Sequence, residues 1–277
     1  MRQRCMSAMI GIPLLILVLC FYKTIVFNLI VGCTAMIAVY EVLRALQCHK
    51  NYLLTSVGLL AALYFAFLSF SPVLENVPVF LAVYIFILFC ILLSSHMTVH
   101  FQQITVVFTA SILFPLGLCS LIYLRDLHGE FGLFYLILVF VLSWICDAGA
   151  YFVGRKFGKH KMAPQISPHK TIEGAIGGVV TNLVFTLIFG GIWELVYTRI
   201  GIPAEISYLN LTLVAVLGSL ISMFGDLSAS VIKRHCQIKD FGNLIPGHGG
   251  IMDRFDSVIF VAPFLYLISQ VLPVIAA

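Results

Sequence analysis

The stretch Ser222-Met-Phe-Gly-Asp226-Leu-Ser-Ala-Ser230-Val-Ile-Lys233-Arg234 follows a long apolar run and carries acids, bases and hydroxyls. A loop comes next, and it ends in Gly247-His248-Gly249-Gly250-Ile-Met-Asp253-Arg254-Phe-Asp256. Residues 222–256 hold eight of the 28 Asp, Glu, Lys and Arg of a chain in which only 10% of the residues are charged. The pattern predicts a site for a polar ligand at the edge of a hydrophobic body.

The composition places that body in a membrane. Of the 277 residues, 61% are hydrophobic, and the mean hydropathy is +1.07. A soluble protein of this length lacks the polar residues to cover so much apolar surface. Helices and closed barrels are the structures that span a bilayer, and long unbroken apolar runs select helices. We therefore expect an all-α integral membrane protein.

Apolar runs of the length that a bilayer requires predict about nine transmembrane helices. Their approximate bounds are 5–22, 24–44, 53–71, 77–95, 104–124, 131–153, 173–198, 208–233 and 254–275. The chain is expected to divide into an N-terminal membrane region, 1–130, with about five spans, and a catalytic region, 131–277, with about four. The loops 154–172 and 234–253 of the second region are expected on the cytoplasmic side.

The distribution of basic residues predicts the orientation. With the N-terminus inside, the inner segments carry 13 of the 16 Lys and Arg, and the outer ones keep Lys23, Arg125 and Arg199. Basic residues favour the cytoplasmic side. We expect a cytoplasmic N-terminus, an outside C-terminus, and a site that faces the cytoplasm.

The eighth expected span carries a polar stripe. Ser219, Ser222, Asp226, Ser230 and Lys233 share one face of an otherwise apolar helix. The loop after it contains Pro246, Gly247, Gly249 and Gly250, which let backbone approach a ligand closely. Because the chain returns tightly, we expect Asp226 to meet Asp253, and we expect Asp253 and Asp256 to share one helical face.

The sixth span and the start of the seventh add further polar groups. Ser143, Asp147, Tyr151 and Gly154 are expected on one helical face. A carboxylate such as Asp147 is costly in the apolar layer unless it is paired, hydrated or bound to a cation, so an interhelical hydrogen bond remains an alternative to a functional role.

Lys170 and Thr171 precede the seventh span, where helix amides can hold phosphate. Glu173 can simply favour the helix dipole. The glycines that follow are expected to allow close helix packing.

Two carboxylates flanked by lysine, arginine and glycine amides suit a magnesium ion with a bound phosphate, since Mg²⁺ takes few carboxylates and completes its shell with phosphate and water. Phosphoryl and nucleotidyl transfer need this neutralisation of charge.

Three segments also resemble one family. The run Ser230-x-x-Lys233-Arg234-x4-Lys239-Asp240-x-Gly242-x2-Ile245-Pro246-x-His248-Gly249-Gly250-Ile251-x-Asp253-Arg254-Phe255-Asp256 is similar to the signature of phosphatidate cytidylyltransferases (CDP-diacylglycerol synthases). Asp147-x-Gly-Ala-Tyr151-x2-Gly-Arg155 and Ser167-Pro-x-Lys170-Thr171-x-Glu173-Gly174 also resemble that family. The resemblance covers roughly 143–256.

The resemblance implies that the phosphate of phosphatidic acid attacks the α-phosphorus of CTP, which gives CDP-diacylglycerol and pyrophosphate. It implies Asp226 and Asp253 as ligands of Mg²⁺, with a second cation such as K⁺ left open, and support from Asp147, Asp256 and Lys233. The expected substrate-binding residues are Lys170, Thr171, Glu173, Ser230, Arg234, Lys239, His248, Gly249, Gly250 and Arg254.

The expected partners are CTP, phosphatidic acid, the bilayer and a second copy of the chain, with no nucleic acid. The expected location is the inner (plasma) membrane. Another CTP-dependent lipid-phosphate cytidylyltransferase or lipid kinase remains an alternative. A transporter is a remote one, because the charges gather in one half of the chain instead of in two repeats.

Overall fold

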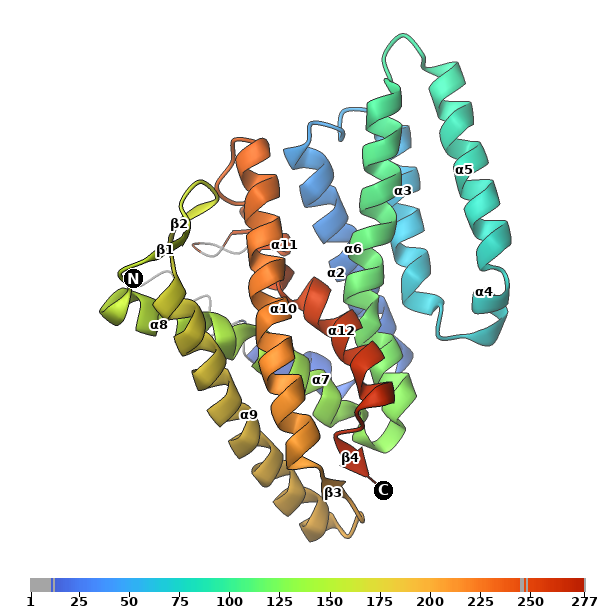
Figure 1. The fold of residues 1–277 in the computed structure, drawn as a ribbon. Coiled ribbons are helices and arrows are strands. Elements are labelled where there is room, and N and C mark those ends of the chain that lie inside the picture. The colour runs from blue at the N-terminus through green and yellow to red at the C-terminus, as the bar shows by residue number, and fades with distance from the viewer. Residues whose placement is uncertain (1–10, 12, 245–246, 248, 277) are drawn as a thin grey trace. The chain divides into compact units, whose positions relative to one another are not determined.

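The computed structural model describes residue 11, residues 13–244, residue 247 and residues 249–276. Most of these residues are helical (Figure 1). Six helical stretches in the described part are long and apolar enough to cross a membrane: Ile25–Ala45, Val77–Ser94, Phe101–Phe157, Ile172–Ile200, Tyr208–His235 and Met252–Val271. A shorter apolar helical segment covers Tyr52–Phe67. The expectation of a helical chain with several candidate membrane spans is therefore confirmed.

The number of spans stays a prediction. The expected spans 104–124 and 131–153 fall within one stretch, Phe101–Phe157, and the expected span 53–71 corresponds to the shorter segment Tyr52–Phe67. The first expected span, 5–22, lies largely outside the described residues.

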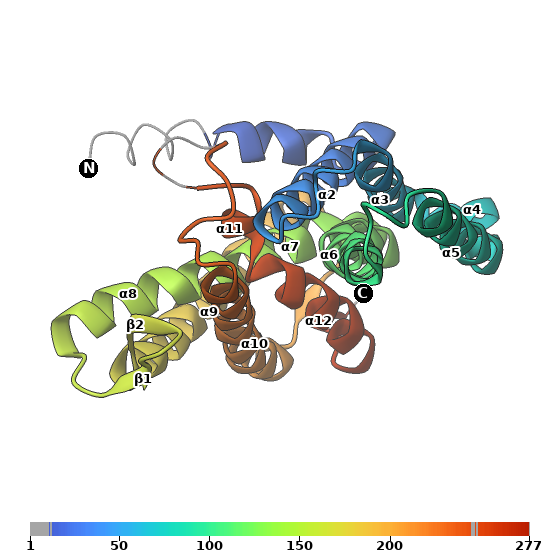
Figure 2. The ribbon, with the colours of Figure 1, turned by 90° about the horizontal axis from the view of Figure 1, so that it is seen from above.

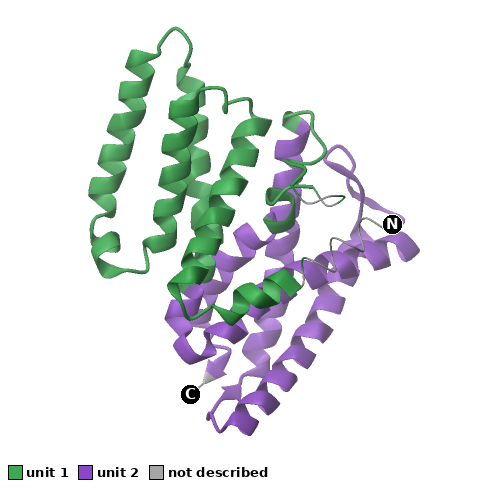
Figure 3. Ribbon diagram, turned by 180° about the vertical axis from the view of Figure 1, so that it is seen from behind, with its two compact units in different colours: residues 1–123, 235–255 green, residues 124–234, 256–277 purple. Residues whose placement is uncertain are grey.

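The chain forms two compact units (Figure 3). The first unit contains residues 1–123 and 235–255, and the second contains residues 124–234 and 256–277. The glycine-rich segment of the opening stretch thus belongs with the N-terminal helices, whereas Asp226 and Asp256 belong to the second unit. The division expected at 130/131 stays a prediction.

The first unit is a group of apolar helices. It contains α2 (Ile25–Ala45), α3 (Tyr52–Tyr64), the 3₁₀ turn η1 (Phe65–Phe67), α4 (Ser71–Glu75), α5 (Val77–Ser94), most of α6 (Phe101–His128) and α11 (Met252–Phe255). Helices α2 and α3 lie side by side (Figure 2). A Cβ on Gly32 of α2 would lie 2.8 Å from Leu63, so the small residue sets this close contact.

The second unit begins with the end of α6 and continues through η2 (Gly129–Phe131), α7 (Gly132–Phe140), a π-helical turn η3 (Val141–Ile145) and α8 (Cys146–Phe157). Helices α9 (Ile172–Ile200), α10 (Tyr208–His235) and α12 (Val258–Val271) complete it. Helices α8 and α9 pack closely: a Cβ on Gly174 would lie 2.8 Å from the carbonyl oxygen of Ala150, and one on Gly178 2.9 Å from that of Cys146. The glycines after Glu173 therefore allow close packing, as expected.

Two short antiparallel strand pairs, of which only the first is a hairpin, add strands to the expected all-α fold. β1 (Lys161–Ala163) pairs with β2 (Ser167–Thr171), and β3 (Glu205–Ile206) pairs with β4 (Ile275–Ala276). The first hairpin folds the expected loop 154–172 back on itself, so that Lys161 lies opposite Thr171. This pairing holds Lys170 directly before the first turn of α9.

The π-helical turn η3 interrupts the regular helix of the sixth expected span just before Asp147. A π turn inserts an extra residue into the helical repeat, and such turns often occur at functional sites. Ser143 is fully buried in the turn, whereas Tyr151 is 60% exposed. Asp147 and Tyr151 lie four residues apart in the regular helix α8, as expected for one face, and the π turn comes before both, so the place of Ser143 on that face stays a prediction.

Candidate functional site

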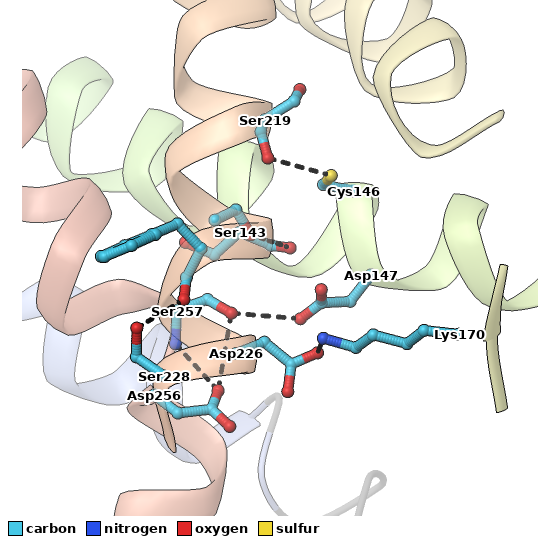
Figure 4. A network of polar contacts seen from close by, with 11 residues as sticks. Ser143, Cys146, Asp147, Lys170, Ser219, Asp226, Ser228, Asp256 and Ser257 are labelled. Atoms are coloured by element: carbon cyan, nitrogen blue, oxygen red, sulfur yellow. Dashed lines mark hydrogen bonds and ion pairs between the residues drawn. The ribbon is translucent and has the colours of Figure 1, made fainter. Parts of the chain in front are cut away.

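A cluster of acids around one lysine lies in the second unit (Figure 4). We call it the acid cluster, and its members are Asp147, Lys170, Asp226, Asp256 and Ser257. Asp147 comes from the first turn of α8, Lys170 from β2, and Asp226 from α10. Asp256 and Ser257 form the turn that precedes α12. Four segments far apart in the sequence thus bring their polar side chains to one place.

The contacts within the acid cluster are specific. Lys170 Nζ lies 2.5 Å from Asp226 Oδ2, and both side chains are about a quarter exposed, 23% and 26%. The Ser257 hydroxyl lies 3.4 Å from Asp147 Oδ2 and 3.5 Å from Asp256 Oδ1. The Ser257 amide donates to Asp256 Oδ1 at 2.8 Å. Lys170 therefore contacts one carboxylate, and the Ser257 hydroxyl joins the other two.

The polar stripe of α10 faces the interior of the second unit. Ser219 and Ser222 are fully buried, and Ser230 is 9% exposed. The Ser222 hydroxyl donates to the carbonyl of Ser143, 3.4 Å away, in the π turn. Asn182 of α9 donates to the Ser219 hydroxyl at 2.7 Å and to the carbonyl of Leu142 at 3.2 Å. These bonds fix α10 against η3 and orient Asp226 toward Lys170.

The residues at the start of α9 serve its local structure. Thr171 is the N-cap, and its hydroxyl accepts the amide of Gly174 at 3.1 Å. This contact satisfies a first-turn amide that an uncapped helix leaves unpaired. The Glu173 carboxylate accepts the amide of Lys159 at 3.0 Å and lies 2.6 Å from His160 Nδ1. Substrate binding by Thr171 and Glu173 stays a prediction.

The residues of the glycine-rich turn, 249–253, lie in the first unit. Asp253 is 8% exposed, and its Oδ2 accepts the amides of Phe241 at 2.7 Å and Gly250 at 3.0 Å. Gly249 has φ +85°, a conformation that glycine adopts without strain. A Cβ there would lie 2.8 Å from Asp253 Oδ2. These glycines thus let backbone approach the protein's own carboxylate.

Asp253 and Asp256 do not share the face of one continuous helix. Asp253 lies in the four-residue helix α11, which ends at Phe255, and α12 begins only at Val258. The Asp256 carboxylate binds the amide of Ser257, a local contact that competes with helical hydrogen bonding. The prediction of a shared face was wrong. The approach of Asp226 to Asp253 stays a prediction.

The remaining predicted site residues have more varied surroundings. Lys233 is partly buried on α10, and Arg234, Lys239 and Arg254 are exposed. Arg234 Nε donates to the carbonyl of Ile166 at 3.0 Å, which ties the end of α10 to the β1–β2 hairpin. His248 lies outside the described residues.

The acid cluster has the donor chemistry for a magnesium ion. Among the described residues, no group of three or more His, Cys, Asp or Glu is placed to hold a metal ion. Mg²⁺ does not need such a group, since it usually takes one or two carboxylates together with phosphate oxygens and waters. Asp226 beside Lys170, or Asp147 and Asp256 joined by Ser257, supplies one or two hard oxygen ligands of this kind, and Lys170 is a cation suited to phosphate. The residues present therefore fit a magnesium ion bound together with a phosphate.

Sequence reasoning missed three residues that organise these sites: Ser257, Asn182 and Glu41. Ser257 directly follows Asp256 and links it to Asp147. Asn182 is a fully buried amide in an apolar helix, a signal that the sequence did contain. The Glu41 carboxylate is buried and accepts the amides of Ile251 and Met252.

Comparison with known proteins shows which family the chain resembles. Residues 2–272 match the model of the cytidylyltransferase family. The phosphatidate cytidylyltransferase of Bacillus subtilis is 33% identical over 274 residues, which cover 97% of both chains. That of Haemophilus influenzae is 40% identical over 163 residues, which are 58% of this chain and 55% of the relative. That of Staphylococcus aureus (strain COL) is 44% identical over 137 residues, 50% of this chain and 49% of the relative.

Proposed function

Because the chain belongs to the cytidylyltransferase family, we propose that it transfers the cytidylyl group of CTP to phosphatidic acid, giving CDP-diacylglycerol and pyrophosphate for phospholipid biosynthesis. The observation that carries this proposal is the similarity to the Bacillus subtilis phosphatidate cytidylyltransferase over 97% of both chains. The apolar helices agree with a substrate that resides in a membrane. The acid cluster supplies groups that suit a nucleotide phosphate.

The reaction forms one phosphorus–oxygen bond and breaks another. A phosphate oxygen of phosphatidic acid attacks the α-phosphorus of CTP, and the bond from that phosphorus to the oxygen leading to the β-phosphate breaks. The electron pair leaves with pyrophosphate. The nucleophile is already an anion, so no residue has to remove a proton from it. The main task of the protein is to align the two phosphates and neutralise their charge.

We assign Mg²⁺ to Asp226 and Asp253, with Asp147, Asp256 and Lys233 in support. When bound, the ion neutralises phosphate charge and orients the leaving group. The contacts of Lys170 and Ser257 favour this assignment because they hold Asp226, Asp147 and Asp256 in place within one unit. Lys170 places a positive charge beside Asp226 and can hold a substrate phosphate. A second cation such as K⁺ is also proposed.

Substrate contacts are proposed for ten polar and glycine residues: Lys170, Thr171, Glu173, Ser230, Arg234, Lys239, His248, Gly249, Gly250 and Arg254. The exposed cations among them suit the triphosphate of CTP, because charge-assisted bonds to phosphate are strong.

The proposed topology has nine spans, a cytoplasmic N-terminus and an outside C-terminus, with the site on the cytoplasmic face of the inner (plasma) membrane. The basic residues of the expected inner segments support it. Fusions of a reporter active only outside, placed after residues 130, 200 and 276, test this order. Activity after 165 or 240 would contradict it.

A homodimer is proposed, and the mass of the protein in a lipid nanodisc tests it.

One assay tests the reaction. Purified protein in mixed micelles is given CTP labelled in the cytosine ring, phosphatidic acid and Mg²⁺, and labelled CDP-diacylglycerol is measured with pyrophosphate. Polyprenyl phosphate and an archaeal ether-lipid phosphate separately test the other cytidylyltransferases. Diacylglycerol with γ-labelled CTP tests the kinase. Label transfer only to one of these other acceptors would overturn the proposed substrate.

A further inference from the structure

Glu41 is a buried acid in the apolar helix α2, four residues before its end. Its side chain is 5% exposed. Glu41 Oε1 accepts the amide of Ile251 at 3.1 Å, and Oε2 accepts the amide of Met252 at 2.8 Å. All three residues belong to the first unit. Because an ionised carboxylate is costly to bury, its burial is offset by these two charge-assisted bonds.

The same turn carries Asp253, the residue next to Met252. Asp253 Oδ2 accepts the amides of Phe241 and Gly250. Four amides between residues 241 and 252 are therefore divided between the carboxylates of Glu41 and Asp253. The turn is therefore held both by its own acid, Asp253, and by Glu41 from α2.

The glycines of the turn leave room for Glu41. A Cβ on Gly242 or Gly250 would collide with the Glu41 carboxylate. The closest atom to such a Cβ at Gly242 is Glu41 Oε1, and the same oxygen is closest at Gly250. The absence of side chains at 242 and 250 is thus explained by Glu41, which lies in a part of the chain that the family signature does not include.

We infer that Glu41 is the positioning residue of Asp253: it fixes the start of α11 through the Ile251 and Met252 amides, and so sets the direction of the Asp253 carboxylate. Helix α11 has only four residues, so its own hydrogen bonds are too few to fix that direction. The functional consequence rests on the proposed role of Asp253 in binding Mg²⁺. The structural consequence, an ordered turn, does not depend on that role.

The first measurement follows the turn itself. Amide hydrogen exchange of peptides covering 241–255 is compared in wild type, Glu41→Ala and Glu41→Gln, in detergent without substrate. Loss of a bond to a charged acceptor predicts about 10- to 100-fold faster exchange at Ile251 and Met252 in the Ala variant. The Gln variant retains one acceptor oxygen and is expected to lie between the two.

Asn28→Leu is the matched control. Asn28 is also a buried polar residue of α2, 1% exposed, and its amide group donates to the carbonyl of Ala66 at 2.9 Å, away from the turn. Its replacement is expected to leave exchange at 241–255 unchanged. Wild-type exchange in Glu41→Ala, or the same acceleration in Asn28→Leu, would overturn the positioning role.

The second measurement follows catalysis. Residues that orient metal ligands typically contribute about 10- to 100-fold to metal affinity or activity. We expect Glu41→Ala to raise the Mg²⁺ concentration for half-maximal rate by that factor, to leave the KM for phosphatidic acid within about twofold, and to be partly rescued by Gln. If faster exchange occurs without any change in the Mg²⁺ requirement, Glu41 orders the turn but does not position a metal ligand. If the wild type does not use CTP, the exchange result still decides whether Glu41 holds the turn.

Discussion

Lys170 Nζ lies 2.5 Å from Asp226 Oδ2, and this ion pair connects the β1–β2 hairpin to the middle of α10. Both side chains retain solvent exposure, so the pair itself contributes only about 0–1 kcal/mol to the free energy of unfolding. The main effect of the ion pair is therefore to position the Lys170 and Asp226 side chains. A lysine that neutralises a proposed metal ligand before substrate arrives can turn to a phosphate once the metal has bound.

We expect Asp226→Asn to abolish turnover while the protein still inserts and folds. If Asp226 holds Mg²⁺, losing its charge removes several kcal/mol of transition-state stabilisation, a loss of at least about 10³-fold in kcat. Labelled CDP-diacylglycerol formation is measured together with the elution volume and melting temperature in detergent. Ser228→Ala, on the same helix, is the control, because that hydroxyl donates to the carbonyl of Phe224, one turn earlier in α10. Near-normal turnover in Asp226→Asn would exclude the metal role.

Removal of Mg²⁺ should stop the reaction reversibly. The acid cluster offers oxygen ligands, and Mg²⁺ bound through one or two carboxylates exchanges readily with a chelator. Activity is measured after dialysis against EDTA and again after addition of Mg²⁺ or Ca²⁺ in excess. We expect recovery with Mg²⁺ and weak recovery with Ca²⁺, because Ca²⁺ prefers more ligands at longer distances. Full activity after exhaustive chelation would contradict the proposal.

Sequence periodicity predicted the α10 side of the acid cluster well. The 3.6-residue repeat places Ser219, Ser222 and Asp226 on one face, and that face is buried against η3 and α9. The start of α9 was also predicted closely, because the seventh span was expected from residue 173 and α9 begins at Ile172, after the N-cap Thr171. Local patterns determine such features, so a single sequence reveals them.

The contacts across long sequence separations were not predictable in this way. Glu41 and Met252 are separated by 211 positions, and no local pattern pairs them. The π turn at Val141–Ile145 was also missed, since its sequence fits a regular helix equally well.

Ser257→Ala should reduce turnover with little effect on stability. The hydroxyl contacts Asp147 Oδ2 and Asp256 Oδ1, and its one proton can serve only one of them at a time. A hydrogen bond to a charged group contributes about 1.5–3 kcal/mol, which predicts a loss of roughly 10- to 100-fold in kcat if both acids must be oriented. Ser257→Thr keeps the hydroxyl and should restore most of the rate. Equal losses in both variants would mean that packing at 257 matters and the hydroxyl does not.

Gly250→Ala should destabilise the protein, and the loss should depend on Glu41. The added Cβ would collide with the Glu41 carboxylate, and overpacking of this kind costs about 1–3 kcal/mol. Because the two positions touch, a double-mutant cycle with Glu41→Ala should show a coupling of about 0.5–3 kcal/mol, with Gly250→Ala less harmful when the carboxylate is absent. The melting temperatures of the four proteins in one detergent measure it. Gly191→Ala is the control, because its Cβ would meet only the Tyr208 hydroxyl, at 3.8 Å, so we expect no loss of stability there. Additive effects of Gly250→Ala and Glu41→Ala would show that the glycine is needed for something other than room for this acid.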